Sequence, residues 1–149
     1  MKSMYAMVAF GIGELLGSLA IGEVVDRLGN RLASWLTIAS VLTQTILILL
    51  FIYKNEFGVL AISLTFFWGV QDAAANTQTQ QLLGFEFQDN VRSFAVFNVA
   101  QSLFTVFVIT LEAYIVTNAE SYVFNTICGL LGIAMCSVTL YFPFKNKRA

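Results

Sequence analysis

Acidic and amide side chains stand inside long apolar stretches of this 149-residue chain. Asp72, Asn76 and Gln80 recur at four-residue steps, so on a helix they share one face. An ionised carboxylate in hydrocarbon costs about 3 kcal/mol or more, so such groups should face a protein interior or a wet cavity. There they would bind a polar solute or relay protons. The candidate substrate-binding or ion-binding residues are Asp72, Asn76, Gln80, Glu14, Asn98 and Gln101.

The same polar residues also have a purely structural interpretation. Glu14 shares a helix face with Ser18, while Gly13 and Gly17 form a pair whose spacing suits close helix packing. Other polar residues that share one helix face are Thr37, Ser40 and Gln44 in one segment and Asn98, Gln101, Thr105 and Glu112 in another. Hydrogen bonds between helices, with protonated carboxyls, would also account for them. Both interpretations stay open at the level of sequence.

The composition points to lipid as the solvent around this chain. Hydrophobic residues make up 58% of it and charged residues only 11%, and the mean hydropathy is +0.76. A soluble domain of this length could not cover its surface with so few charges. The net charge of -1 and the lack of a basic patch give no reason to expect nucleic acid as a partner.

Residues with catalytic or metal-binding chemistry are scarce. The chain contains no histidine, which removes the commonest general base and the commonest metal ligand. Cys128 and Cys136 are eight residues apart, about 12 Å along a helix, too far for a disulfide. We therefore expect no catalytic residues, no metal site, no cofactor and no enzymatic activity.

Five apolar segments are long enough to cross a membrane as helices, since a span needs about 20 residues. They predict an all-α integral membrane protein with a single transmembrane domain over residues 1–149, made of spans at 4–25, 32–53, 57–83, 93–116 and 121–144 and a short tail at 145–149. One set of connections holds Arg27, Arg31 and Arg92, and the tail holds Lys145, Lys147 and Arg148. The positive-inside rule places these six, and the C-terminus, in the cytoplasm. The N-terminus then lies outside, and the odd number of spans predicts a missing helix upstream.

The segment GEVVDRLGNR between the first two spans concentrates charge in a turn. Its spacing resembles the signature loop of the major facilitator superfamily (MFS), which joins the second and third helices of each six-helix half. The matching residues are Gly22, Asp26, Arg27, Gly29 and Arg31. By this resemblance they form a cytoplasmic gate, with Gly29 permitting the turn and Asp26 bonding Arg27, Arg31 or a helix N-terminus. The alternative is an ordinary charged turn.

Four further segments are similar to the C-terminal half of Unc-ninety-three-like proteins, the ion channel regulatory family. They are GIGELLGS at 11–18, WGVQDAAANTQ at 68–78, LLGFEF at 82–87 and RSFAVFNVAQSL at 92–103. The resemblance implies that the five transmembrane helices correspond to helices eight to twelve of a twelve-helix MFS fold, within its C-terminal six-helix half. The chain would then be a fragment, a truncated gene model or a degenerate paralogue.

Two functions follow from the resemblance. The first is part of a secondary transporter that moves a small solute or ion by alternating access. The alternative is a non-enzymatic regulatory or trafficking subunit of an ion channel or receptor. The partners expected are the lipid bilayer, the missing N-terminal helices or a second copy, and in the alternative a channel or receptor. The plasma membrane and an internal membrane are equally open.

Overall fold

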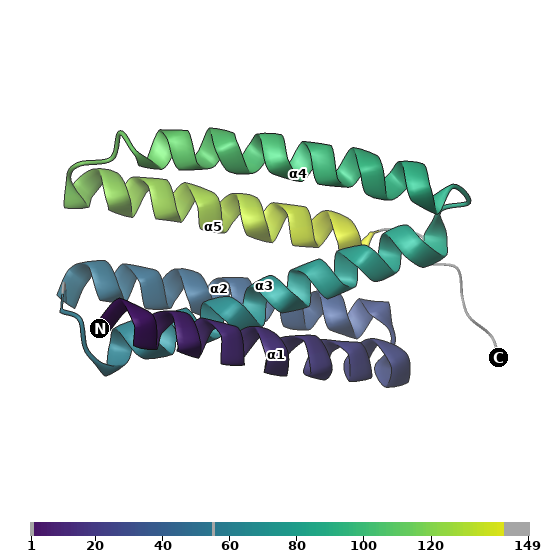
Figure 1. The fold of residues 1–149 in the computed structure, drawn as a ribbon, viewed down its shortest axis with the longest axis horizontal. Helices are drawn as coiled ribbons and strands as arrows, with labels where there is room; N and C mark the ends of the chain where they lie inside the picture. The colour runs from purple at the N-terminus through teal and green to yellow at the C-terminus, as the bar shows by residue number, and fades with distance from the viewer. Residues whose placement is uncertain (1, 55, 142–149) are drawn as a thin grey trace.

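The computed structural model describes residues 2–54 and 56–141. Within them the chain forms five α-helices, which confirms the all-α prediction (Figure 1). The helices are α1 (Lys2–Leu28), α2 (Asn30–Lys54), α3 (Val59–Glu86), α4 (Asn90–Glu112) and α5 (Asn118–Leu140). The predicted tail at 145–149 and the last three residues of the predicted fifth span lie outside the described residues.

Four of the described helices, α1, α2, α4 and α5, are long and apolar enough to cross a membrane. Helix α3 has 28 residues but is not among the four, which departs from the five equivalent spans predicted. The reason is its polar content. It carries Asp72, Asn76, Gln71, Gln78, Gln80 and Gln81.

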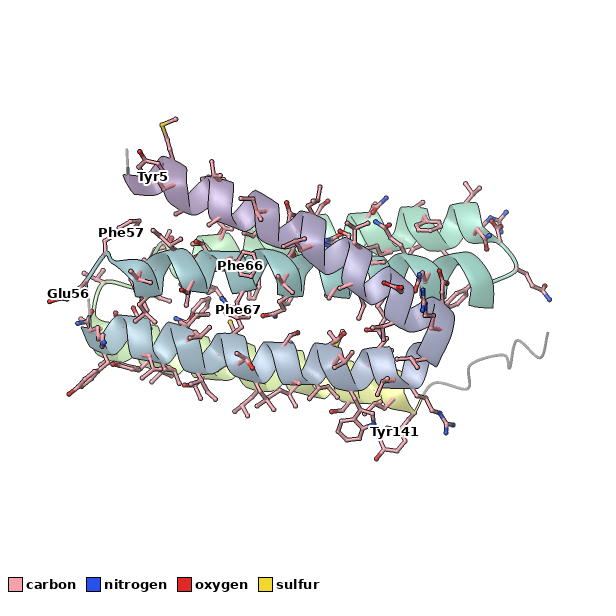
Figure 2. The ribbon with its side chains drawn as sticks, turned by 90° about the horizontal axis from the view of Figure 1, so that it is seen from below. Tyr5, Glu56, Phe57, Phe66, Phe67 and Tyr141 are labelled. Atoms are coloured by element: carbon pink, nitrogen blue, oxygen red, sulfur yellow. The ribbon has the colours of Figure 1, made fainter. Side chains whose placement is uncertain are left out.

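The helices run up and down, so that alternate turns share an end of the bundle (Figure 1). The α1–α2 turn, flanked by Arg27 and Arg31, lies at the same end as the α3–α4 turn, which Arg92 follows. Figure 2 shows Tyr141, after α5, at this end and Glu56 and Phe57, after α2, at the opposite one. The two arginine-bearing turns therefore share one end of the bundle.

The boundary between α4 and α5 differs from the prediction for a local reason. Thr117 and Glu120 form a capping box, in which the Glu120 backbone N–H donates to Thr117 Oγ1 and the Glu120 carboxylate accepts from the Thr117 backbone N–H. The same carboxylate accepts from the Val116 backbone N–H at 3.0 Å. The backbone amides of Val116 and Thr117 thus bond forward to Glu120 and cannot continue α4. Helix α4 ends at Glu112, before the predicted end at residue 116.

Helices α1 and α3 run in the same direction, and their backbones come into contact at glycines. A Cβ at Gly17 would lie 2.7 Å from the carbonyl oxygen of Val70, and one at Gly13 would collide with the carbonyl oxygen of Phe66. On α3, a Cβ at Gly69 would collide with the carbonyl oxygen of Phe10. The pair predicted from sequence, Gly13 and Gly17, is therefore a helix-packing pair.

The α1–α2 turn depends on a residue with a positive φ. Gly29 adopts φ +89°, the left-handed region that glycine enters at little cost. The turn brings α2 back beside α1 and α3, where Ile21, Ala33 and Ala74 form a small buried cluster. This confirms the prediction that Gly29 permits the turn.

Helix α4 stands apart from this core. None of its residues is buried, and among the described helices only α3 brings Cα atoms within 8 Å of those of α4. Helix α5 instead packs on α2, where Gly129 lies against Thr45 and Gly132 against Val41. The bundle therefore consists of a packed set of four helices with α4 at its edge.

Replacing Gly13 with alanine should lower the stability of the chain by about 1–3 kcal/mol, because a rigid backbone carbonyl occupies the space of the new methyl group. Gly11→Ala is the matched control, since nothing lies within 4 Å of a Cβ there. Thermal unfolding of the two purified variants in detergent compares them. An equal loss in both would contradict the backbone contact.

Candidate functional site

Polar side chains of α1 and α3 line a groove of about 460 Å³ between the two helices. Its lining residues are Gly11, Glu14, Leu15 and Ser18 from α1 and Ala73, Asn76, Thr77 and Gln80 from α3. Leu15, Ser18 and Gln80 are exposed, so the groove is open to the surroundings of the bundle. The groove lies beside the backbone contact between α1 and α3, because its lining residue Glu14 directly follows Gly13 in the chain.

Three of the six candidate binding residues meet in this groove, namely Glu14, Asn76 and Gln80. Asp72 lies one helical turn before Asn76 and is tied to it, because Asn76 Nδ2 donates a hydrogen bond to Asp72 Oδ2 at 3.1 Å. Asp72 is half-buried and does not itself line the groove. The polar face predicted for α3 therefore contributes two lining residues and one supporting carboxylate.

The remaining candidates, Asn98 and Gln101, do not line this groove. Both are exposed on α4, which contacts α3 but not α1. The structure therefore separates them from Glu14, Asn76 and Gln80. The sequence could place these two amides on one face of a helix but not decide which helix that face would meet.

All polar side chains that line the groove carry an acceptor oxygen, and two of them, Thr77 and Gln80, also carry a donor. The Ser18 hydroxyl donates to the backbone carbonyl of Glu14 at 2.7 Å, so its oxygen keeps free lone pairs. Asn76 turns its Nδ2 toward Asp72, which leaves its Oδ1 as an acceptor. Together with the Glu14 carboxylate, these groups favour a ligand that donates hydrogen bonds or carries positive charge.

A second polar cluster lies between α2 and α3 and is satisfied internally. Gln78 Nε2 donates to Ser34 Oγ at 2.5 Å, and Thr37 Oγ1 donates to Gln78 Oε1 at 3.0 Å. All three side chains are buried. Sequence reasoning singled out Thr37 but missed its partners. The three-residue step from Ser34 to Thr37 was the available signal, since it places both hydroxyls on one helix face.

Three glutamines of the described residues, Gln44, Gln71 and Gln81, have buried amide atoms without a hydrogen-bond partner. Gln44 is 4% exposed, and neither its Oε1 nor its Nε2 is hydrogen-bonded within the described part of the chain. Gln71 Oε1 is likewise buried and has no hydrogen-bond partner among the described residues. Gln44 and Gln71 each lie seven residues from a member of the Thr37–Gln78 pair, so they belong to the same α2–α3 seam. An unpaired buried amide costs stability and does not add to it.

The residues of the predicted gate lie at and before the α1–α2 turn, but their bonding differs from the expectation. Arg27 Nη2 pairs with Glu23 Oε1 at 2.8 Å, one turn back on α1, and both side chains are mostly exposed. Asp26 and Arg31 are exposed and form no ion pair within the described residues. Asp26 therefore makes neither of the two arginine contacts predicted as alternatives for it, and Arg27 pairs instead with Glu23, because residues four apart are neighbours on a helix.

Gln78 and Gln44, both on the α2–α3 seam, should respond differently to replacement by leucine. Gln78→Leu should destabilise the chain by about 1 kcal/mol, the scale of hydrogen bonds between helices in membranes, since it removes two interhelical bonds. Gln44→Leu should leave the stability unchanged or raise it, because it removes an unpaired buried amide. Unfolding midpoints in detergent measure both. A loss at Gln44 as large as that at Gln78 would show that Gln44 has a partner.

The chain matches no protein-family model, no curated protein and no solved structure. Its functional interpretation therefore stands on its own residues and their geometry. The most informative feature among them is the groove between α1 and α3, with its acceptor oxygens and its supporting carboxylate.

Proposed function

We propose that this chain is a multi-pass membrane protein of MFS type and forms part of a secondary transporter for a small solute or ion. The observation that carries the proposal is the α1–α3 groove, which brings Glu14, Asn76 and Gln80 together from two helices. Polar groups converging in one hollow are typical of ligand sites. Membrane transporters place such sites between helices, near the middle of the bilayer.

The depth of the carboxylates supports this assignment. Glu14 lies near the middle of α1 and Asp72 near the middle of α3. Neither side chain could reach an aqueous boundary from there along its own helix, so an ionised form needs water in the groove or a polar partner. Asp72 has such a partner in Asn76, and Glu14 has the groove.

The charge at the helix ends supports an orientation. Arg27, Arg31 and Arg92 share one end of the bundle, which the positive-inside rule assigns to the cytoplasm. The C-terminal end of α5 lies at this same end (Figure 2). The C-terminus is cytoplasmic in this proposal.

The charged turn fits the gate of an alternating-access transporter. Such a gate must open and close, so its contacts should be weak enough to exchange. The Arg27–Glu23 pair is exposed, and exposed pairs contribute about 0–1 kcal/mol. Asp26 and Arg31 are exposed at the same turn, where they could contact another segment in the closed state.

A hydrated groove makes a direct prediction for cysteine labelling in membranes. With Cys128 and Cys136 replaced by alanine, Thr77→Cys should react with a water-soluble methanethiosulfonate, because residue 77 lines the groove. Leu19→Cys should not react, since Leu19 is 67% exposed on α1 but is not a groove residue, so lipid would cover it. Absence of labelling at residue 77 would contradict a wet pathway.

Transport itself predicts a defect in the Asp72→Asn variant. Asparagine keeps an acceptor for Asn76 but removes the charge, so proton movement coupled through this site should stop while the fold is kept. The measurement is proton uptake into liposomes that hold the full chain and a trapped pH dye, under an imposed potential. Glu112→Gln, at the end of α4, is the control. Equal uptake in the wild type and in Asp72→Asn would remove the support for a coupling role.

A regulatory or trafficking subunit of a channel or receptor is the second candidate, and α4 is the observation that favours it. This helix has no buried residue and exposes Phe104 and Phe107. An unpartnered helix of this kind could dock on another membrane protein. Co-purification of a channel or receptor would then survive Asp72→Asn and fail after Phe104→Ala with Phe107→Ala.

A further inference from the structure

We propose that the α1–α3 groove recognises a small, singly charged organic ammonium ion. This inference rests on the proposed function, because it needs the groove to be hydrated within a membrane. It adds the chemical class of the ligand, which neither the composition nor the resemblance to a family provides. Three features carry it: the sign of the charge near the groove, the acceptor oxygens of its lining, and its size.

The charge near the groove is acidic. Glu14 lines it and Asp72 supports it through Asn76. The basic residues of the described helices lie near helix ends, and Arg27 is about 20 Å along α1 from Glu14. Arg27 is also already paired, with Glu23. A groove with carboxylates and distant bases concentrates cations and repels anions.

Every polar side chain of the lining offers an acceptor oxygen to the ligand, although Thr77 and Gln80 can also donate. The Ser18 proton is used on the Glu14 carbonyl, and an Asn76 Nδ2 proton is used on Asp72. The Glu14 carboxylate is a pure acceptor when ionised. An ammonium ion donates up to three hydrogen bonds and accepts none, so it is complementary to these acceptors.

The size and the apolar part of the lining favour an organic ion over a bare metal ion. The groove holds about 460 Å³, within the range of about 300–1,000 Å³ typical of small-molecule sites. Gly11, Leu15 and Ala73 give it an apolar side against which a hydrocarbon group can pack. Among the described residues, no three His, Cys, Asp or Glu side chains gather to hold a metal ion. A single lining carboxylate balances a single positive charge.

The sign of the charge can be tested without knowing the natural ligand. Thr77→Cys, with the two native cysteines replaced by alanine, is reacted with a trimethylammonium methanethiosulfonate and with a sulfonate analogue. Each rate is divided by that of a free thiol in water, which removes intrinsic reactivity. The cationic reagent should react at least about tenfold faster after this correction, and Glu14→Gln should remove most of the preference. Glu112→Gln should leave it unchanged.

The outcomes of this experiment separate the two proposals. Equal corrected rates, or a preference for the anionic reagent, would overturn the cation inference while leaving the wet pathway intact. No reaction with either reagent would overturn the proposed function itself. A preference that persists in Glu14→Gln would also overturn the inference, since the field would then come from elsewhere.

Direct binding tests the class of cation. Radiolabelled methylammonium and radiolabelled rubidium are each presented to the purified full chain in detergent. Methylammonium should bind saturably, compete with larger alkylammonium ions, and lose at least about tenfold in affinity in Glu14→Gln but not in Glu112→Gln. Binding of rubidium alone would assign the groove to a metal ion and overturn the proposal. The absence of methylammonium binding up to about 10 mM would overturn it as well.

Discussion

The close contact between α1 and α3 decides where the polar residues of this protein meet. Gly13, Gly17 and Gly69 remove the side chains that would otherwise keep the two backbones apart. Helices that touch in this way cannot slide, because the next residues along each helix carry a Cβ. The register is therefore fixed, with a Cβ at Gly69 reaching the backbone nitrogen of Glu14. In this register Glu14 and Asn76 line the same groove beside the glycine contact.

Helix α3 uses two of its faces for different purposes. One face turns Gln78 toward α2, where Ser34 and Thr37 satisfy its amide. The other turns Asn76 and Gln80 toward α1, where they line an open groove. Since α3 also contacts α4, three helices cover it and little of its surface has to be lipophilic. Its position in the bundle thus explains why α3 is the one long described helix that falls short of the apolarity of a membrane span.

The helices and the composition of their faces could be predicted well from the sequence. Which face packs against which neighbouring helix could not. Apolar length was sufficient to find all five helices, and glycine spacing to identify Gly13 and Gly17 as packing residues. Periodicity defines which residues share a face, but in a chain this apolar no contrast with water marks the face that points inward. For this reason Gln78 was missed as a partner of Thr37, and Asn98 was grouped with residues that it does not approach. The end of α4 was missed because a capping box, and not hydropathy, determines it.

Helix α4 shows what the transporter and the subunit hypotheses have in common. Its amides Asn98 and Gln101 are exposed on the bundle, and within the described part of the chain only α3 approaches it closely. In hydrocarbon each amide would lose its hydrogen bonds to water, a cost that helices in membranes avoid by burying such groups against protein. A transporter would cover this face with further helices or a second copy, and a regulatory subunit would cover it with its channel or receptor. Under both hypotheses a protein surface would lie against α4, so the two hypotheses differ in which protein that surface would belong to.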